Sequence, residues 1–190
     1  MNLKGSKTEP YVLAAFAGES QARTRYTFFA SVAKKEGLEQ ISALFTETAD
    51  NEKEHAQLFF RFLQGGDAEI TAKYPAGVIG TTAQNLKAAA AGEKLEWGTL
   101  YPEAAEIAEK EGFTGIATTF RRIAMVEEKH EQRYLKLFQN LESGQVFKKP
   151  SVVKWKCRNC GHVLESDSAP DRCPVCSHDR AYFELFVENY

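Results

Sequence analysis

Two Glu-x-x-His motifs are the residues of this sequence whose types and spacing most clearly suggest chemistry. One consists of Glu52 and His55, and the other of Glu127 and His130. Residues three positions apart lie on the same face of a helix, so each motif can offer a carboxylate oxygen and an imidazole nitrogen to one metal ion. A single motif is weak, because an exposed, charged helix face in a glutamate-rich chain has the same pattern.

The two motifs belong to an internal repeat. Ala33–Gly37 (AKKEG) matches Ala108–Gly112 (AEKEG) at an offset of 75 residues, and the same offset relates the two motifs to each other. It also relates Tyr26 to Tyr101, and the chain has only four histidines. One offset shared by all these positions is hard to obtain by chance, so the repeat favours metal ligation over an accidental pattern.

Each motif interrupts an apolar helix face. In steps of three and four residues, Glu52 and His55 fall between Phe45 and Phe59, and a third carboxylate, Glu19, interrupts the apolar face of the first helix in the same way. An unpaired carboxylate in a bundle core costs several kcal/mol, about 3 or more, which a bound cation would offset. The alternative, core histidines ion-paired with glutamates, is disfavoured by the repeat.

The third helix departs from the repeat by one residue. Ala17–Glu19 matches Ala91–Glu93 at an offset of 74 instead of 75, which places one extra residue between Glu93 and Tyr101. A π-bulge absorbs an extra residue within a helix, and such bulges are frequent at functional sites. The second half of the repeat thereby offers two inward carboxylates, Glu93 and Glu96, and we expect an asymmetric site.

These positions together predict a carboxylate-rich site for a pair of metal ions. Five carboxylates and two imidazoles suit two iron or manganese ions better than zinc, which takes fewer oxygen ligands. Tyr26 and Tyr101 either hydrogen-bond the ligand oxygens or serve as core aromatic residues. The predicted ligands are Glu19, Glu52, His55, Glu93, Glu96, Glu127 and His130.

The four cysteines of the chain form two Cys-x-x-Cys pairs near its C-terminal end. Cys157 and Cys160 make the first pair, and Cys173 and Cys176 make the second. This spacing is typical of a tetrathiolate metal site, and without an export signal we expect a metal rather than disulfides. Zinc and a rubredoxin-type iron both fit the spacing.

The pattern of residues predicts the elements that position these groups. Helical periodicity runs to about residue 143 and is punctuated at 36–37, 64–80 and 111–112, which gives helices over 8–36, 38–64, 82–111 and 113–142. Four helices with one long crossover are typical of a ferritin-like bundle. We therefore expect a mainly α protein with a ferritin-like domain over residues 1–146 and a small β-rich, rubredoxin-like domain over 147–190.

Composition limits the classes of partner. The net charge of -2 gives no reason to expect nucleic acid, and the apolar runs are too short to span a bilayer. The first residues contain no apolar signal region. We expect a soluble, cytoplasmic protein without nucleic-acid or membrane partners.

The whole chain resembles the rubrerythrin family. The resemblance is carried by FAGESQARTRY (16–26), AAAGEKLEW (89–97), the two Glu-x-x-His motifs and the paired cysteines. It implies a non-haem diiron peroxidase that reduces hydrogen peroxide to water in oxidative-stress defence, with electrons passing through a single iron on the four cysteines. It also implies that His55 and Glu96 alternate as ligands of one iron, and that Tyr26 and Tyr101 contact the ligands. One departure is Ser177, where rubredoxins usually have glycine.

The distance along the last helix predicts a homodimer. His130 and Glu142 are twelve residues apart, or about 18 Å of helix, so the cysteine domain begins far from the diiron site of its own chain. A head-to-tail homodimer would shorten the path, and the resemblance implies the same arrangement. It further implies an external electron donor, either a rubredoxin or an NAD(P)H-dependent reductase.

Two other functions are compatible with the same residues. One is a ferritin-like protein that oxidises and stores iron and carries a structural zinc ribbon. The other is a structural or interaction protein with zinc on the cysteines and no redox role. The metal bound by the four cysteines distinguishes both from the peroxidase.

Overall fold

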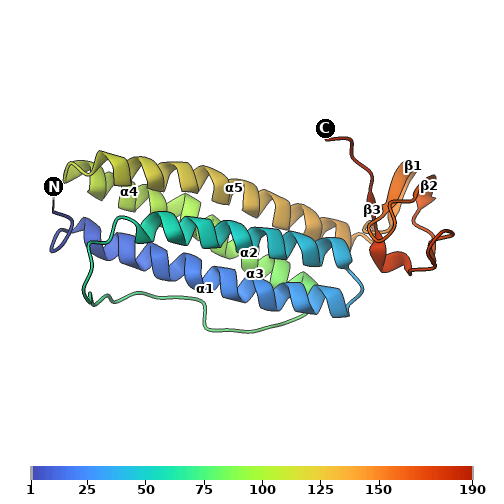
Figure 1. Cartoon of the computed structure of the whole chain (residues 1–190), viewed down its shortest axis with the longest axis horizontal. Helices are drawn as coiled ribbons and strands as arrows, with labels where there is room; N and C mark the ends of the chain where they lie inside the picture. Colours follow the sequence, from blue (N-terminus) through green and yellow to red (C-terminus); the bar gives the residue numbers. More distant parts are fainter. Residues whose placement is uncertain (1, 190) are drawn as a thin grey trace.

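The computed structural model describes residues 2–189 and consists of a long helical bundle with a small β domain at one end (Figure 1). The first helix, α1 (Thr8–Lys35), pairs along its length with α2 (Glu39–Phe60), and the last helix, α5 (Thr114–Glu142), pairs with α3 (Thr82–Leu95) and α4 (Tyr101–Lys110). Residues 61–81 form the long crossover between these two helical pairs. The predicted ferritin-like arrangement is confirmed, and each pair corresponds to one half of the repeat.

Both tight connections between paired helices use the same turn. Gly37 and Gly112 follow the last helical turns with φ of +73° and +83°, a conformation that a side chain disfavours. The amide of Leu38 then donates to the Ala33 carbonyl at 2.9 Å, and that of Phe113 to the Ala108 carbonyl at 2.8 Å. These bonds are the Schellman pattern, and they explain why the Glu-Gly pairs ended the predicted helices correctly.

The second helix ends earlier than the sequence indicated. We expected residue 64, but α2 ends at Phe60 and the next residues form a tighter turn, in which the Phe62 and Leu63 amides bond to carbonyls three residues back. The turn brings both side chains against the apolar cluster that contains Phe59 and Phe120. Their tertiary packing therefore overrides the continued helical period.

The predicted distortion of the third helix is present. Between α3 and α4 the chain forms a π-helical segment, η1 (Glu96–Leu100), which includes the position of the extra residue. Pro102 follows at the start of α4, and its nitrogen cannot donate a hydrogen bond back to η1. The wider turn carries Glu96 on its first residue.

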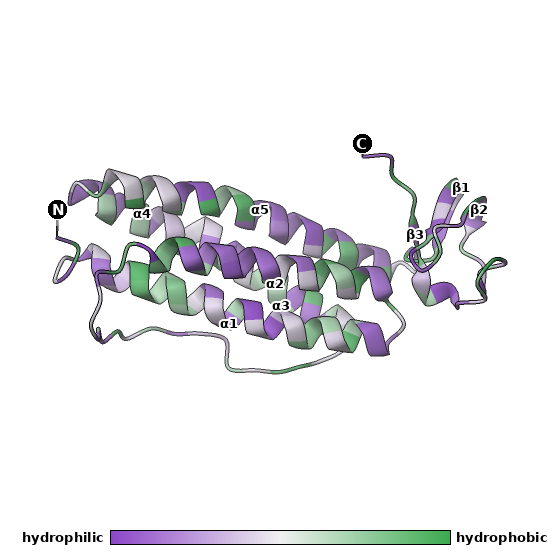
Figure 2. Ribbon diagram, in the orientation of Figure 1, coloured by the Kyte–Doolittle hydropathy of each residue, from purple (hydrophilic) through white to green (hydrophobic). Residues whose placement is uncertain are grey.

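The interior of the bundle is divided into two apolar clusters by a layer of buried polar residues. One cluster surrounds Tyr26, Phe45 and Tyr134, and the other surrounds Phe59 and Phe120. In Figure 2 the middle turns of α2 are hydrophilic while more hydrophobic turns lie on both sides of them. The buried polar side chains of that layer are Glu19, Glu52, His55, Glu93, Glu127 and His130.

The β domain is a three-stranded antiparallel sheet. Its strands are β1 (Lys148–Cys157), β2 (Val163–Ser168) and β3 (Phe183–Leu185), with β1 in the centre. Its core is small and centres on Trp155 and Phe183. A short 3₁₀ helix, η2 (Arg180–Tyr182), lies against the bundle near the turn between α1 and α2.

The two cysteine turns differ in the residue that follows the second cysteine, Gly161 in one and Ser177 in the other. Gly161 and Ser177 each donate their amide to the first cysteine of the pair, both at 2.9 Å, and both have a left-handed backbone, with φ of +80° and +60°. A non-glycine residue in this conformation costs about 1 kcal/mol. Ser177 is thus the strained member of an otherwise equivalent pair of turns.

We predict that Ser177→Gly stabilises the β domain. The free energy of unfolding should rise by up to about 1 kcal/mol, reduced by the greater freedom of glycine in the unfolded chain. Denaturant titration measures the change, followed by Trp155 fluorescence in a Trp97→Phe background that removes the other tryptophan. A matched Gly161→Ser variant should shift the midpoint in the opposite direction, and equal stability of all three proteins would contradict the explanation.

Within residues 2–189, no helix is long and apolar enough to cross a membrane.

Candidate metal centres

The first cluster of ligand atoms forms around His55. Its Nδ1 atom lies 2.8 Å from Glu127 Oε1, 2.9 Å from Glu52 Oε2 and 3.7 Å from Glu19 Oε2. These three carboxylates come from α5, α2 and α1, and all four side chains are buried. One nitrogen and three oxygens therefore converge on a space suited to a single cation.

The second cluster forms around His130. Its Nδ1 atom lies 2.7 Å from Glu127 Oε2 and 3.2 Å from Glu52 Oε1, and Glu93 from α3 completes the group. Glu52 and Glu127 belong to both clusters, with one oxygen of each facing either histidine. Two carboxylates shared between two histidines are the arrangement expected of ligands that bridge a pair of metal ions.

Several carboxylate oxygens of this layer lack a well-oriented hydrogen-bond donor in the described part of the protein. Among residues 2–189, the buried atoms without a hydrogen bond of acceptable geometry include Glu19 Oε2, both oxygens of Glu52, Glu93 Oε2 and Glu127 Oε1. Buried carboxylate oxygens are normally hydrogen-bonded or paired with a cation. The donor set, rich in oxygen with one imidazole per cluster, fits two iron ions.

For Tyr26 and Tyr101 the sequence allowed two roles, hydrogen bonding to the ligand oxygens or packing in the core. The Tyr26 hydroxyl donates to Glu93 Oε1 at 2.5 Å, and the Tyr101 hydroxyl donates to Glu19. Both rings also pack in the apolar clusters. The tyrosines thus hold two of the terminal carboxylates in place, one from each half of the repeat.

Burial and mutual repulsion alter the titration of these groups in the metal-free protein. Burial raises the pKa of Glu19 to about 8, with contributions from the charges of Glu127 and Glu52, and burial likewise raises the pKa of Glu93 and Glu96. Burial alone would lower the pKa of His130, but hydrogen bonds with Glu127 and Glu52 raise it to about 9. Several ligands therefore carry protons near pH 7 when no metal is bound.

Metal uptake should therefore release protons and tighten as the pH rises. A cation binds the deprotonated ligands, so each proton lost from Glu19 or His130 favours binding at higher pH. We expect anaerobic Fe²⁺ titrations to give a higher affinity at about pH 8 than at about pH 6, with more than one proton released per ion. Calorimetry in buffers of different ionisation enthalpy measures both quantities, and pH-independent affinity would contradict the assignment.

Glu96 is the one predicted ligand outside both clusters. It is half-buried at the start of η1, and its Oε1 atom lies 3.9 Å from the position that a Cβ atom on Gly18 would occupy. His55, and not Glu96, belongs to the first cluster with Glu19, Glu52 and Glu127. This placement matches the predicted alternation of His55 and Glu96, whose roles as ligands remain predictions.

Two interactions near the site were not anticipated from the sequence. Trp97 donates its indole N–H to Glu131 of α5 at 2.6 Å. Tyr134 lies edge-on to Tyr26 at 5.5 Å and is fully buried with its hydroxyl unpaired, so it is a third tyrosine beside the site. Its position on the apolar face of α5 was visible in the sequence, but nothing there distinguished it from a core aromatic residue.

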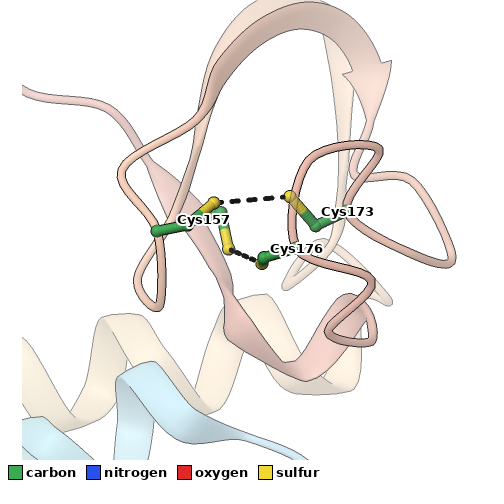
Figure 3. A group of neighbouring side chains, drawn as sticks. Cys157, Cys173 and Cys176 are labelled. Atoms are coloured by element: carbon green, nitrogen blue, oxygen red, sulfur yellow. Dashed lines mark hydrogen bonds between the residues drawn. The ribbon is translucent and has the colours of Figure 1, made fainter.

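The four cysteines form the second metal site. All are free thiols, with Cys157 Sγ 3.7 Å from Cys176 Sγ and Cys160 Sγ 3.6 Å from Cys173 Sγ. A tetrahedral ion with metal–sulfur bonds of about 2.3 Å requires sulfur separations of about 3.8 Å, so the observed spacing fits. Figure 3 shows the labelled thiols of Cys157, Cys173 and Cys176 turned toward one another from the two cysteine turns.

Comparison with known proteins identifies relatives of both parts of the chain. The rubrerythrin family model matches residues 11–138, and the model of the rubrerythrin rubredoxin-like domain matches residues 155–184. Rubrerythrin of Porphyromonas gingivalis is 61% identical over 189 residues, which covers 100% of this chain and 94% of that protein.

Solved structures agree in fold. The fully reduced, all-ferrous state of nigerythrin superposes with a TM-score of 0.64 at 27% identity, covering 97% of this chain and 91% of that one. An open-pore ferritin from Archaeoglobus fulgidus has a TM-score of 0.61 at 18% identity, covering 75% of this chain and 88% of that one, and shows the shared fold alone. The predicted cofactors, a diiron carboxylate site and an iron on four cysteines, are confirmed. The ligand roles of individual residues and the domain boundary at 146–147 remain predictions.

Proposed function

This chain belongs to the rubrerythrin family, and on that premise we propose that it is a peroxidase that reduces hydrogen peroxide to water. The observation that carries the proposal is the pair of buried Glu/His clusters with shared Glu52 and Glu127, on the same chain as a four-cysteine site. The reaction consumes one peroxide, two electrons and two protons and yields two waters. When bound, a pair of irons supplies one electron from each ion, which matches this demand.

The residues of the chain prepare the site for this reaction. Glu52 and Glu127 would hold both metal ions, and Tyr26 and Tyr101 orient Glu93 and Glu19 by hydrogen bonds. Preorganised ligands need little rearrangement when the charge of the site changes. The surrounding apolar clusters limit the access of water.

We place the adjustable part of the site at Glu96 and His55. The π-helical turn that carries Glu96 and the absence of a side chain at Gly18 leave this carboxylate room to move toward the first cluster. An anionic carboxylate favours the more highly charged oxidised metal, and a neutral imidazole suits the reduced one. The His55 cluster seen here is the arrangement we assign to the reduced protein.

We propose that electrons come from the four-cysteine site of a second copy of the chain, where Cys157, Cys160, Cys173 and Cys176 would hold an iron that supplies one-electron redox chemistry. Within one chain, the β domain lies beyond the end of the bundle, near the turn between α1 and α2. The exposed side chains of Met125 and Val126 lie beside His130, and Cys160 and Val175 are exposed at the cysteine site. We propose that these surfaces meet in a head-to-tail homodimer, and that a rubredoxin or an NAD(P)H-dependent reductase supplies the β domain.

Anaerobic purification, metal analysis and rapid mixing test the proposal. The peroxidase requires about three irons per chain and a visible spectrum of ferric tetrathiolate iron. On mixing the fully reduced protein with hydrogen peroxide or with dioxygen, peroxide should oxidise the diiron site much faster. Zinc on the cysteines of the native protein, or faster reaction with dioxygen, would instead support the iron-storage alternative. Sedimentation showing only an active monomer would contradict the dimer.

A further inference from the structure

A cavity of about 410 Å³ lies beneath the crossover and ends beside Glu96. Residues 72–75 of the crossover form one wall, and α1 and the α3–α4 helix form the others. The polar side chains of the lining are Gln21, Arg25, Lys73 and Glu96, together with three tyrosines, and the rest of the lining is apolar. The apolar lining includes Ala14, Leu95, Leu100, Ala104 and Phe120.

Tyr74 closes the cavity on the crossover side. Its hydroxyl donates to the backbone carbonyl of Ala14 at 2.8 Å, which ties the crossover to α1. Its ring atom Cε1 lies 3.6 Å from the position of a Cβ atom on Gly18, and Glu96 Oε1 lies 3.9 Å from the same point. The missing side chain at Gly18 therefore leaves the space beneath Tyr74 continuous with Glu96.

The cavity is larger than hydrogen peroxide requires. Hydrogen peroxide is about the size of two water molecules, or about 60 Å³, whereas pockets for small organic molecules have about 300–1,000 Å³. A cavity of about 410 Å³ falls in the second range. The hydrophobic effect does not favour burial of the small, polar hydrogen peroxide against an apolar wall. It does favour transfer of an alkyl or aryl group from water to such a wall.

We propose that this cavity binds the organic group of an alkyl or aryl hydroperoxide, with the peroxide group directed to Glu96. The inference rests on the proposed peroxidase function and names a second substrate class for the same site. The O–O bond of the hydroperoxide breaks, and two electrons and two protons convert it to one alcohol and one water. The electrons come from the reduced protein, which an NAD(P)H-linked reductase or dithionite replenishes.

Steady-state reduction of cumene hydroperoxide and of hydrogen peroxide by the iron-loaded, full-length protein tests the proposal. We expect turnover of both. Reduction of hydrogen peroxide without reduction of cumene hydroperoxide overturns this inference alone. Reduction of neither overturns the proposed function, and the inference fails with it.

Filling the cavity should change the preference between the two substrates. Ala14→Phe places a ring in the apolar part, and we expect kcat/KM for cumene hydroperoxide relative to that for hydrogen peroxide to fall about tenfold or more. Ala72→Phe fills the cavity from the exposed crossover, where the fold is not at risk. Ala88→Phe, on the exposed face of α3, is the matched control and should leave the ratio unchanged. An unchanged ratio in both filling variants overturns the inference.

Binding of the alcohol product provides a readout independent of turnover. Calorimetric titration of the oxidised protein with 2-phenylpropan-2-ol should show saturable binding that weakens at least about fivefold in Ala14→Phe and not in Ala88→Phe. Equal affinity in the native protein and Ala14→Phe places the aryl group elsewhere and overturns the assignment of this cavity.

Discussion

Glu52→Gln is expected to abolish the diiron site while leaving the bundle folded. Glu52 belongs to both ligand clusters, with Oε2 2.9 Å from His55 Nδ1 and Oε1 3.2 Å from His130 Nδ1. The amide keeps the size of the side chain, but it removes the negative charge and replaces one ligand oxygen by an NH₂ group. With Glu52 as the predicted shared ligand, both metal positions lose a ligand through this one substitution.

The expected effects are large in metal content and in turnover. Iron should fall from about three to about one per chain, because only the four-cysteine site is unaffected. Peroxide turnover should fall by more than about a hundredfold. Substitution of a residue that only contacts a metal ligand already lowers metal affinity or activity by about 10–100-fold. Metal analysis and stopped-flow absorbance measure the two quantities.

Glu54→Gln is the matched control for this substitution. Glu54 lies two residues further along α2 and is exposed. This variant should keep its iron and its activity. Retention of both irons in Glu52→Gln would contradict the bridging role. If circular dichroism shows that Glu52→Gln is unfolded, Glu127→Gln, which changes the other shared carboxylate, provides the same test.

Cys157→Ser is expected to unfold the β domain and, on the proposed function, to stop turnover supported by NAD(P)H. Cys157 is fully buried between the two cysteine turns, and the core of the domain otherwise consists of little more than Trp155, Ala169 and Phe183. So small a core depends on its metal, and binding of structural zinc contributes about 10–16 kcal/mol in zinc-finger peptides. Trp155 fluorescence and the loss of the ferric thiolate spectrum should report the unfolding.

The same variant should keep the chemistry of the bundle. Chemically reduced Cys157→Ser should still oxidise its diiron site when mixed once with peroxide, because the clusters are built from α1, α2, α3 and α5 alone. Loss of this single turnover would contradict independent domains.

Protein of unchanged sequence, reconstituted with zinc in place of iron at the four cysteines, distinguishes the effect of the metal on folding from its effect on electron transfer. Zinc restores the tetrahedral site and the fold, but it has no redox chemistry. Single turnover should therefore be normal while steady-state turnover stays absent. Full steady-state activity with zinc would show that electrons reach the bundle by another route.

The sequence by itself was enough to predict the fold and the two metal sites, for physical reasons that can be named. Helical periodicity and the Glu-Gly turns have local causes, namely burial of one helix face and the left-handed backbone at Gly37 and Gly112. The internal repeat indicated the predicted metal ligands, because buried carboxylates on an apolar helix face are destabilising unless a cation is bound. Even the π-helix was predictable, since one extra residue in a continuous helix must be accommodated there.

Other features depend on contacts between residues far apart in the chain, and only the tertiary structure decided them. The end of α2 is determined by how Phe62 and Leu63 pack, and the pairing of Trp97 with Glu131 by how η1 meets α5. Tyr134 becomes a neighbour of the site only through its contact with Tyr26. The cavity needs residues from α1, the α3–α4 helix and a crossover with no periodic pattern, so no local signal could have indicated that Tyr74 would cover the approach to Glu96.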